Sequence, residues 1–137
     1  MNKEDYVSLE VAKILKEKGF NEYCGAYYHL IWKDMTEEEC FEVAPNHDFR
    51  NKDNGYRAGA PTLYEAAKWL RKTHDIHIVV SPHYSRKYEI IEYEYSIATY
   101  FDFLEKPFKW RKSKEYYEKY EQCLNNAILE ALKLINC

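Results

Sequence analysis

Residues 89–103 read EIIEYEYSIATYFDF, and this stretch decides the fold class. Apolar and aromatic residues alternate with polar ones almost strictly, which is typical of an antiparallel strand with one buried and one solvated face. The buried side is predicted to carry Ile91, Tyr93, Tyr95, Ile97, Thr99, Phe101 and Phe103. The solvated side is predicted to carry Glu92, Glu94, Ser96 and Asp102. A single strand of this length would approach ~50 Å, so we expect a bend or bulge, or two strands.

Three helices flank this stretch in the sequence. Ser8 and Gly19 have the residue types of an N-cap and a left-handed C-cap, which predicts a helix of about three turns between them. Thr62 with Glu65 forms a capping box, which predicts a second helix that ends near Thr73 or His74. A third helix is predicted from about Ser113 to Ile135, with an apolar stripe of Tyr117, Tyr120, Leu124, Ala127, Ile128, Ala131 and Ile135.

Further strands are predicted outside the alternating stretch. Residues 26–32 and 76–80 are rich in aromatic and β-branched residues, and Ser81-Pro82 is expected to stop the second of these strands. Residues 36–44 carry both a capping box and an alternating pattern, and we favour a strand that pairs with 26–32. Residues 45–61 are rich in Asn, Asp, Gly and Pro, which indicates a loop or a small hairpin with a turn at Asn54-Gly55.

Together these segments predict an α+β fold in the order α-β-(β)-α-β-β-α. We expect the helices to pack on one face of a mainly antiparallel sheet of 3–5 strands. The chain has 137 residues, which suits a single domain over 1–137.

The composition excludes several classes of protein. The formal net charge is only -3, which argues against a generally basic nucleic-acid protein and against a disordered acidic tail. The sequence has neither a signal peptide nor an apolar stretch of membrane-spanning length, so we expect a soluble, cytoplasmic protein without a membrane partner. The four cysteines form no Cys-x-x-Cys pair, so we expect reduced structural or surface thiols.

Three phrases in the chain resemble a known group of proteins. They are YVSLEVAKILKEKGF (6–20), PTLYEAAKWLR (61–71) and AILEALKLI (127–135). They are similar to small uncharacterised proteins from phages, prophages and mobile elements of gut anaerobes. That group usually begins its last helix with Ser- or Thr-Tyr-Glu-Glu-Ala, whereas this chain has YEQCL at 120–124, and residues 35–59 look specific to it. The resemblance implies an accessory protein of a mobile element and assigns no catalytic residue.

The sequence contains no constellation that points to an enzyme. His74, His77 and His83 lie near the strand at 76–80, but their spacing matches no metal-ligand pattern. No P-loop, dinucleotide-binding, nucleophile-elbow or zinc-protease motif occurs. We therefore expect no metal, no cofactor and no catalytic residue.

The strongest charge pattern lies in residues 106–114, which are basic with interleaved aromatic residues. Such a segment can grip phosphates and stack on unpaired bases. As a nucleic-acid site it would use Lys106, Lys109, Trp110, Arg111, Lys112 and Lys114. The alternative interpretation, which we favour, is a solvated connector whose cations face the acidic side of the sheet.

The 14 tyrosines indicate a second functional class, a protein-interaction module. Periodicity assigns Tyr93, Tyr95, Tyr117 and Tyr120 to the core. The off-pattern tyrosines are candidates for a contact surface, namely Tyr27, Tyr28, Tyr56, Tyr84, Tyr88 and Tyr116. We expect a non-enzymatic accessory protein that binds another protein, with nucleic-acid binding through 106–114 as the alternative.

Overall fold

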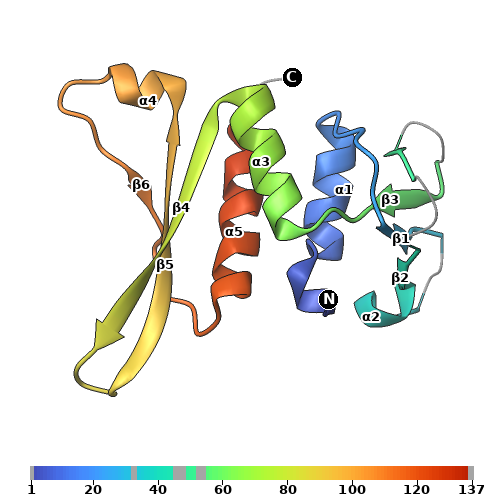
Figure 1. Cartoon of the computed structure of the whole chain (residues 1–137), viewed down its shortest axis with the longest axis horizontal. Coiled ribbons are helices and arrows are strands. Elements are labelled where there is room, and N and C mark those ends of the chain that lie inside the picture. Colours follow the sequence, from blue (N-terminus) through green and yellow to red (C-terminus); the bar gives the residue numbers. More distant parts are fainter. Residues whose placement is uncertain (1, 32–33, 45–48, 52–54, 136–137) are drawn as a thin grey trace. The chain divides into compact units, whose positions relative to one another are not determined.

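A computed structural model describes residues 2–31, 34–44, 49–51 and 55–135. The chain divides into two compact units, one within residues 1–66 and one within residues 67–136. Figure 1 labels the helices and strands. Among the described residues, the strands form two antiparallel sheets of three strands each, with the orders β2-β1-β3 and β4-β5-β6.

The α+β class and the antiparallel pairing are therefore confirmed, whereas the expectation of one sheet is wrong. Each sheet pairs only strands from one side of helix α3 (Leu63–His74) in the sequence. Pairing between sequence neighbours closes the shortest loops, and α3 separates the two sets of strands along the chain. The single-domain organisation stays a prediction.

In the first unit, helix α1 (Leu9–Glu17) begins and ends where the sequence predicts. The Ser8 side chain accepts a hydrogen bond from the Val11 backbone N–H at 3.3 Å. At the other end Gly19 has a φ of +92°, and the Phe20 N–H donates to the Leu15 carbonyl at 2.9 Å. This is the Schellman arrangement, and it turns Phe20 into the core of the unit.

The segment 36–44 contains both of the structures that its pattern allows. Helix α2 (Glu37–Cys40) has the predicted capping box between Thr36 and Glu39. Strand β2 (Phe41–Val43) follows at once and pairs with β1 (Ala26–His29), as expected. Strand β1 ends at His29, earlier than expected, since Leu30 and Ile31 are not part of it; Trp32 lies outside the described residues.

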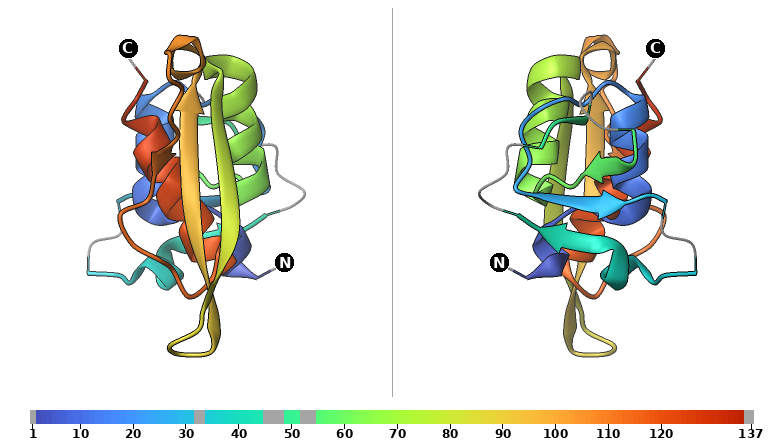
Figure 2. Two further views of the ribbon diagram at one scale, coloured as in Figure 1. Left: turned by 90° about the vertical axis from the view of Figure 1, so that its left-hand side faces the viewer. Right: turned by 90° about the vertical axis from the view of Figure 1, so that its right-hand side faces the viewer.

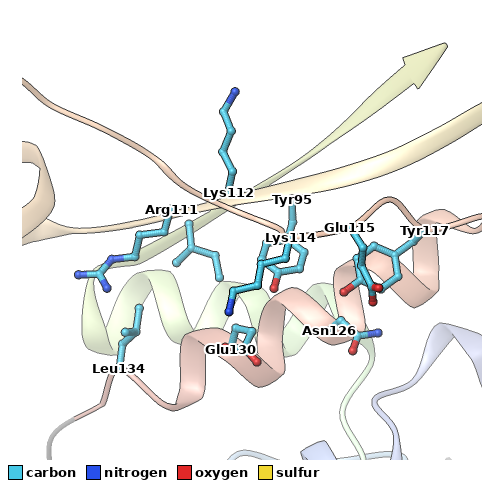
Figure 3. A pocket seen from close by; sticks show the side chains of 10 residues that line it. Tyr95, Arg111, Lys112, Lys114, Glu115, Tyr117, Asn126, Glu130 and Leu134 are labelled. Atoms are coloured by element: carbon cyan, nitrogen blue, oxygen red, sulfur yellow. The ribbon is translucent and has the colours of Figure 1, made fainter. Parts of the chain in front are cut away.

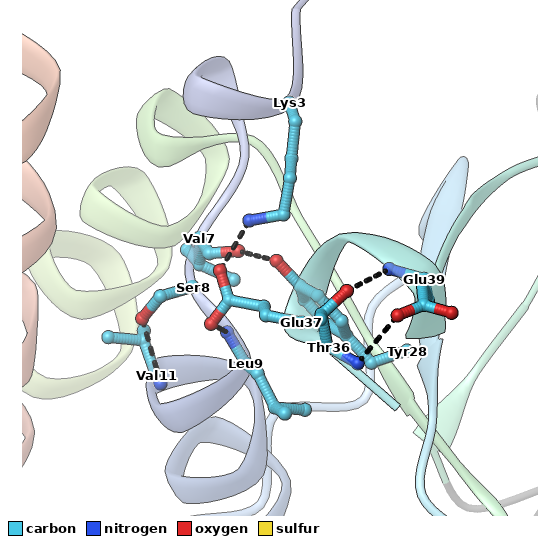
Figure 4. Close-up of polar contacts among 9 residues, drawn as sticks. All are labelled: Lys3, Val7, Ser8, Leu9, Val11, Tyr28, Thr36, Glu37 and Glu39. Atoms are coloured by element: carbon cyan, nitrogen blue, oxygen red, sulfur yellow. Dashed lines mark hydrogen bonds and ion pairs between the residues drawn. The ribbon is translucent and has the colours of Figure 1, made fainter. Parts of the chain in front are cut away.

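Figure 4 shows how Glu37 connects the start of α2 to the N-terminal segment. One oxygen of Glu37 accepts the Leu9 backbone N–H at 3.0 Å, and the other pairs with Lys3 in the 3-10 helix η1 (Lys3–Asp5). Beside them the buried Tyr28 hydroxyl donates to the Val7 carbonyl at 2.7 Å. These contacts tie η1, α1 and β1 into one unit.

Part of the predicted loop 45–61 is a strand. Strand β3 (Arg57–Gly59) pairs with β1 rather than with another part of the loop. Asn54 of the predicted turn lies outside the described residues. Strand β3 has only three residues, too few for a sequence pattern, so its pairing depends on tertiary contacts.

In the second unit, strand β4 (Ile76–Ser85) runs through Ser81-Pro82 instead of stopping there. Pro82 lies opposite Tyr93 on β5 (Ile90–Thr99), and the backbone N–H and C=O of Tyr93 bond to Tyr117 on its other side. The Pro82–Tyr93 pair is therefore not hydrogen-bonded, and the Pro82 nitrogen points to the outer edge of the sheet. A proline is tolerated there because no ladder bond is lost.

We predict that Pro82 limits strand pairing along this edge. Pro82→Val adds an outward N–H to edge strand β4, so the variant should self-associate more strongly than the wild type with rising concentration. Sedimentation velocity measures this directly. Ser81→Val is the matched control, because the Ser81 backbone faces β5. Equal sedimentation of Pro82→Val and wild type would contradict the prediction.

The alternating stretch 89–103 is neither one bent strand nor two strands. Strand β5 ends at Thr99, and residues Tyr100–Leu104 form helix α4. Thr99 and Asp102 form a capping box that starts the helix, so Asp102 belongs to α4 and not to the acidic face of the sheet. Tyr95 and Ile97 are buried as predicted, whereas Ile91, Phe101 and Phe103 are exposed.

The last helix begins later than predicted. Helix α5 (Tyr120–Leu132) starts seven residues beyond Ser113, and the preceding residues include strand β6 (Arg111–Lys112) on the edge of β5. Tyr117 forms a bridge to Tyr93 and is not helical. Ala127, Ile128, Ala131 and Ile135 of the predicted stripe are buried. The left view of Figure 2 shows α5 behind the long hairpin of β4 and β5.

Among the helices of the described ranges, none combines the length and apolar character that crossing a membrane requires.

Candidate functional site

Helix α4 exposes all of its apolar side chains. The exposed fractions are 53% for Tyr100, 75% for Phe101, 45% for Phe103 and 58% for Leu104, and no residue of the helix is buried. Trp110, on the segment that follows, is 39% exposed. We call these five side chains the α4 surface. Contiguous exposed apolar side chains are unusual in a folded protein and mark contact sites.

Asp102 fixes helix α4 to the sheet. Its Oδ2 accepts the Thr99 backbone N–H at 2.9 Å, and its own N–H donates to Thr99 Oγ1 at 3.2 Å. Arg111 of β6 donates from Nε to Oδ2 at 2.8 Å and from Nη2 to Oδ1 at 3.0 Å. One carboxylate therefore caps the helix and ties it to the neighbouring strand.

Aromatic rings support the same surface from the following segment. The ring centroid of Phe103 lies 4.8 Å from that of Phe108 and 5.8 Å from that of Trp110, and Phe108 lies 5.3 Å from Trp110. The centroid of the His77 imidazole on β4 lies 5.7 Å from that of the Phe103 ring, and the two rings are inclined at 75°. These contacts hold part of each ring in place while the outer part stays exposed.

The hydrogen bonds from Arg111 and Thr99 lower the pKa of Asp102 to about 2. Because the folded pKa lies below the unfolded value of about 4, the ionised carboxylate stabilises the fold above pH ~4, and this stabilisation is lost as the pH falls toward 2. We expect wild type to exceed Asp102→Asn in stability at pH 7 and the difference to shrink below pH ~4. The midpoints of urea unfolding of both proteins at pH 7, 4 and 2.5 measure this difference in stability. A difference that does not change with pH would contradict the prediction.

The structure brings three of the basic residues of 106–114 to one cavity, namely Arg111, Lys112 and Lys114, but not Lys106 or Lys109. All six candidates are exposed, namely Lys106, Lys109, Trp110, Arg111, Lys112 and Lys114. Arg111 is engaged by Asp102, and Trp110 packs in the aromatic cluster. In Figure 3, the Lys112 side chain points away from α5, whereas that of Lys114 points toward it. Arg111 and Lys112 are neighbours on β6, so alternation places these two side chains on opposite faces of the strand.

The cavity between β6 and α5 has mixed charge. It has a volume of about 580 Å³, and its wall includes the cations Arg111, Lys112 and Lys114 and the carboxylates Glu115 and Glu130. Tyr95 lies in the wall, and burial raises the pKa of its hydroxyl to about 12. The two carboxylates weaken the attraction of this cavity for phosphate groups.

The three histidines have separate neighbours. His74 lies against Trp69, His77 pairs with Asp75, and His83 stacks on Tyr116. His74 Nε2 is buried with no hydrogen-bond partner in the part of the chain that the structure describes. Within that part, no three His, Cys, Asp or Glu side chains gather as a metal site would require.

The cysteines that the structure describes have the environment of structural thiols. Cys24, Cys40 and Cys123 are free and buried. Burial raises the pKa of Cys24 to about 12 and that of Cys123 to about 11. Both thiols are protonated at neutral pH, so they are poor nucleophiles. Cys137 lies outside the described residues.

The tyrosine assignments are correct in part. Tyr95 is buried as predicted, but Tyr120 is exposed, and Tyr27 and Tyr28, expected at the surface, are buried. The remaining off-pattern tyrosines are exposed, namely Tyr56, Tyr84, Tyr88 and Tyr116. The sequence interpretation missed the α4 surface because it placed Phe101 and Phe103 on the buried face of a strand. The Thr99-x-x-Asp102 capping signal would have revealed the helix.

Comparison with protein-family models, with curated proteins and with solved structures found no match to this chain.

Proposed function

We propose that this chain is a non-enzymatic accessory protein that binds another protein through the α4 surface. The observation that carries this proposal is the exposure of all four apolar side chains of a helix that is nevertheless firmly anchored. Burying a Phe or Leu side chain contributes roughly 1.5–3 kcal/mol of favourable free energy relative to leaving it exposed. The apolar side chains of α4 lack much of this contribution because they are exposed. A partner that covers the helix would bury them and gain it on binding.

The charges around the surface indicate the chemistry of the partner. Residues 100–112 contain four Lys or Arg residues and two acidic ones. Asp102 is already paired with Arg111, and Lys106 and Lys109, like Glu105, are exposed and follow the helix closely in the sequence. An apolar patch with a basic border is complementary to an apolar patch with an acidic border.

Protein binding is better supported than nucleic-acid binding. A nucleic-acid site on 106–114 needs its cations and its stacking ring on one accessible face. In Figure 3, Lys112 and Lys114 point in different directions. Arg111 is paired with Asp102, and the Trp110 ring contacts Phe103 and Phe108. A cytoplasmic location and an origin in a mobile element are part of the same proposal and rest on the sequence.

The test is capture of partners by the tagged full chain from its native host, with and without nuclease. Three forms are compared: wild type, Phe101→Ser/Leu104→Ser and the control Tyr64→Ser, which removes an equally exposed side chain on α3 (68% exposed). We expect wild type and Tyr64→Ser to capture a polypeptide that is still retained after nuclease treatment. The α4 double variant should lose it.

Two outcomes would overturn the proposal. One is retention of the same polypeptides by the α4 double variant. The other is capture that disappears with nuclease for every form, which would favour the nucleic-acid alternative. Circular dichroism of the variants checks that the fold is kept, which we expect because the replaced side chains are exposed.

A further inference from the structure

A second cavity lies at the base of α4. It has a volume of about 460 Å³ and is formed within the second unit by the ends of α3 and α5, the start of β4 and the first residues of α4. Its apolar wall includes Ile76, Phe101 and Leu134. Its polar wall includes Thr99, Arg111 and Lys133.

The side chains that line this cavity include two permanent cations and no carboxylate among the described residues. The neighbouring cavity shares Arg111 and Leu134 with it but also contains Glu115 and Glu130. Asp102 and Glu130, which pair with Arg111 and Lys133, stand outside the wall. The lining therefore combines cations with apolar side chains, a combination that suits an anion attached to an apolar group.

Arg111 keeps donor capacity despite its pair with Asp102. Asp102 accepts from Nε and Nη2 of a guanidinium that has five N–H donors. The pair between Lys133 and Glu130, at 2.9 Å, is an exposed pair of neighbours on one helix, which is weak. The last carbonyls of α3 and α5 favour cations, so the preference for an anion depends on these two side chains.

The cavity is continuous with the α4 surface, because Tyr100 and Phe101 belong to both. A partner segment that packs on Phe101 would place its next group at the mouth of the cavity. We propose that the cavity binds a carboxylate of the partner segment, next to an aromatic or aliphatic residue that packs on Phe101. This inference rests on the proposed function and specifies the chemistry of the partner.

The test uses two matched pairs of small probes in ¹⁵N NMR titrations of the full chain. N-acetylphenylalanine against its amide tests a terminal carboxylate. N-acetyl-Glu-Phe-amide against N-acetyl-Gln-Phe-amide tests a side-chain carboxylate. We expect at least one acid to bind about tenfold more tightly than its neutral match, since charge-assisted hydrogen bonds favour it. The amides of Thr99, Phe101 and Leu134 should shift.

Lys133→Gln should abolish the preference for the acid. Lys106→Gln, which removes a charge beside α4 but not from the cavity wall, should keep it. Equal affinity of acid and neutral probe in both pairs, or an unchanged preference in Lys133→Gln, would overturn the inference. The two proposals can fail separately. If the probes show no preference for the carboxylate, capture of a partner by the α4 surface can still be observed. If the Phe101→Ser/Leu104→Ser variant captures the same partner as wild type, the protein-binding role is refuted even if the probes bind.

Discussion

Replacement of Asn51 by leucine is expected to lower the free energy of unfolding by about 2–4 kcal/mol. Asn51 is a buried polar side chain, only 7% exposed. Its Nδ2 donates to the Phe20 carbonyl at 2.7 Å, and its Oδ1 accepts the Gly59 backbone N–H at 2.8 Å. Leucine has a similar size but can neither donate to the Phe20 carbonyl nor accept from the Gly59 N–H, so both hydrogen bonds are lost at a buried site.

Urea unfolding followed by circular dichroism measures this loss. Glu22→Leu is the control, because it adds the same side chain at an exposed position nearby and should change stability by less than about 0.5 kcal/mol. Equal midpoints for Asn51→Leu and the control would show that the amide does not connect α1 to β3 as described.

The second large effect is expected in the other unit, for Ile128→Ala. Ile128 is fully buried on α5, which packs against β4 and β5. Removing its side chain should cost about 2–5 kcal/mol, from lost burial and from the cavity that remains. Leu129→Ala on the same helix is the matched control, because Leu129 is only half-buried and should cost less. A larger loss for Leu129→Ala would contradict the placement of the core.

These two variants together test the prediction of a single domain. If the chain unfolds cooperatively, Asn51→Leu and Ile128→Ala each shift one common transition. If the compact units unfold independently, each variant shifts only its own transition and leaves the other in place. Fluorescence and circular dichroism recorded on the same samples distinguish the two cases.

The elements that the sequence predicted correctly have strong local signals. The helix starts at Ser8 and Thr62 are fixed by caps within one turn, and Gly19 supplies the left-handed residue of a C-cap. Such signals need only a few neighbouring residues, so they can be read without the fold. The buried positions Tyr95 and Ile97 follow equally from alternation.

The secondary-structure predictions are wrong where contacts beyond the local sequence determine the structure. Alternation continues past Thr99, yet its capping box with Asp102 starts a helix and moves Phe101 out of the core. Pro82 stays in a strand because the strand lies at an edge. Strands β3 and β6 have three and two residues, so their pairing depends on partners far away in the sequence.

The candidate site was predictable only in part. The basic and aromatic composition of 106–114 is evident from the sequence. Which of its side chains are available for binding depends on the ion pair between Arg111 and Asp102 and on the packing of the Phe103, Phe108 and Trp110 rings. The sequence alone could not place the α4 residues beside this segment, because that requires β6 to return to the edge of β5.

The most direct test of the protein-binding surface is photo-crosslinking in the native host. The full chain carries p-benzoylphenylalanine at Phe101 or, as the control, at Tyr64, and the products are separated after nuclease treatment. We expect a discrete, nuclease-resistant adduct with another polypeptide from position 101 and none of that mass from position 64. No adduct from position 101, or the same adduct from both positions, would contradict the role of the α4 surface.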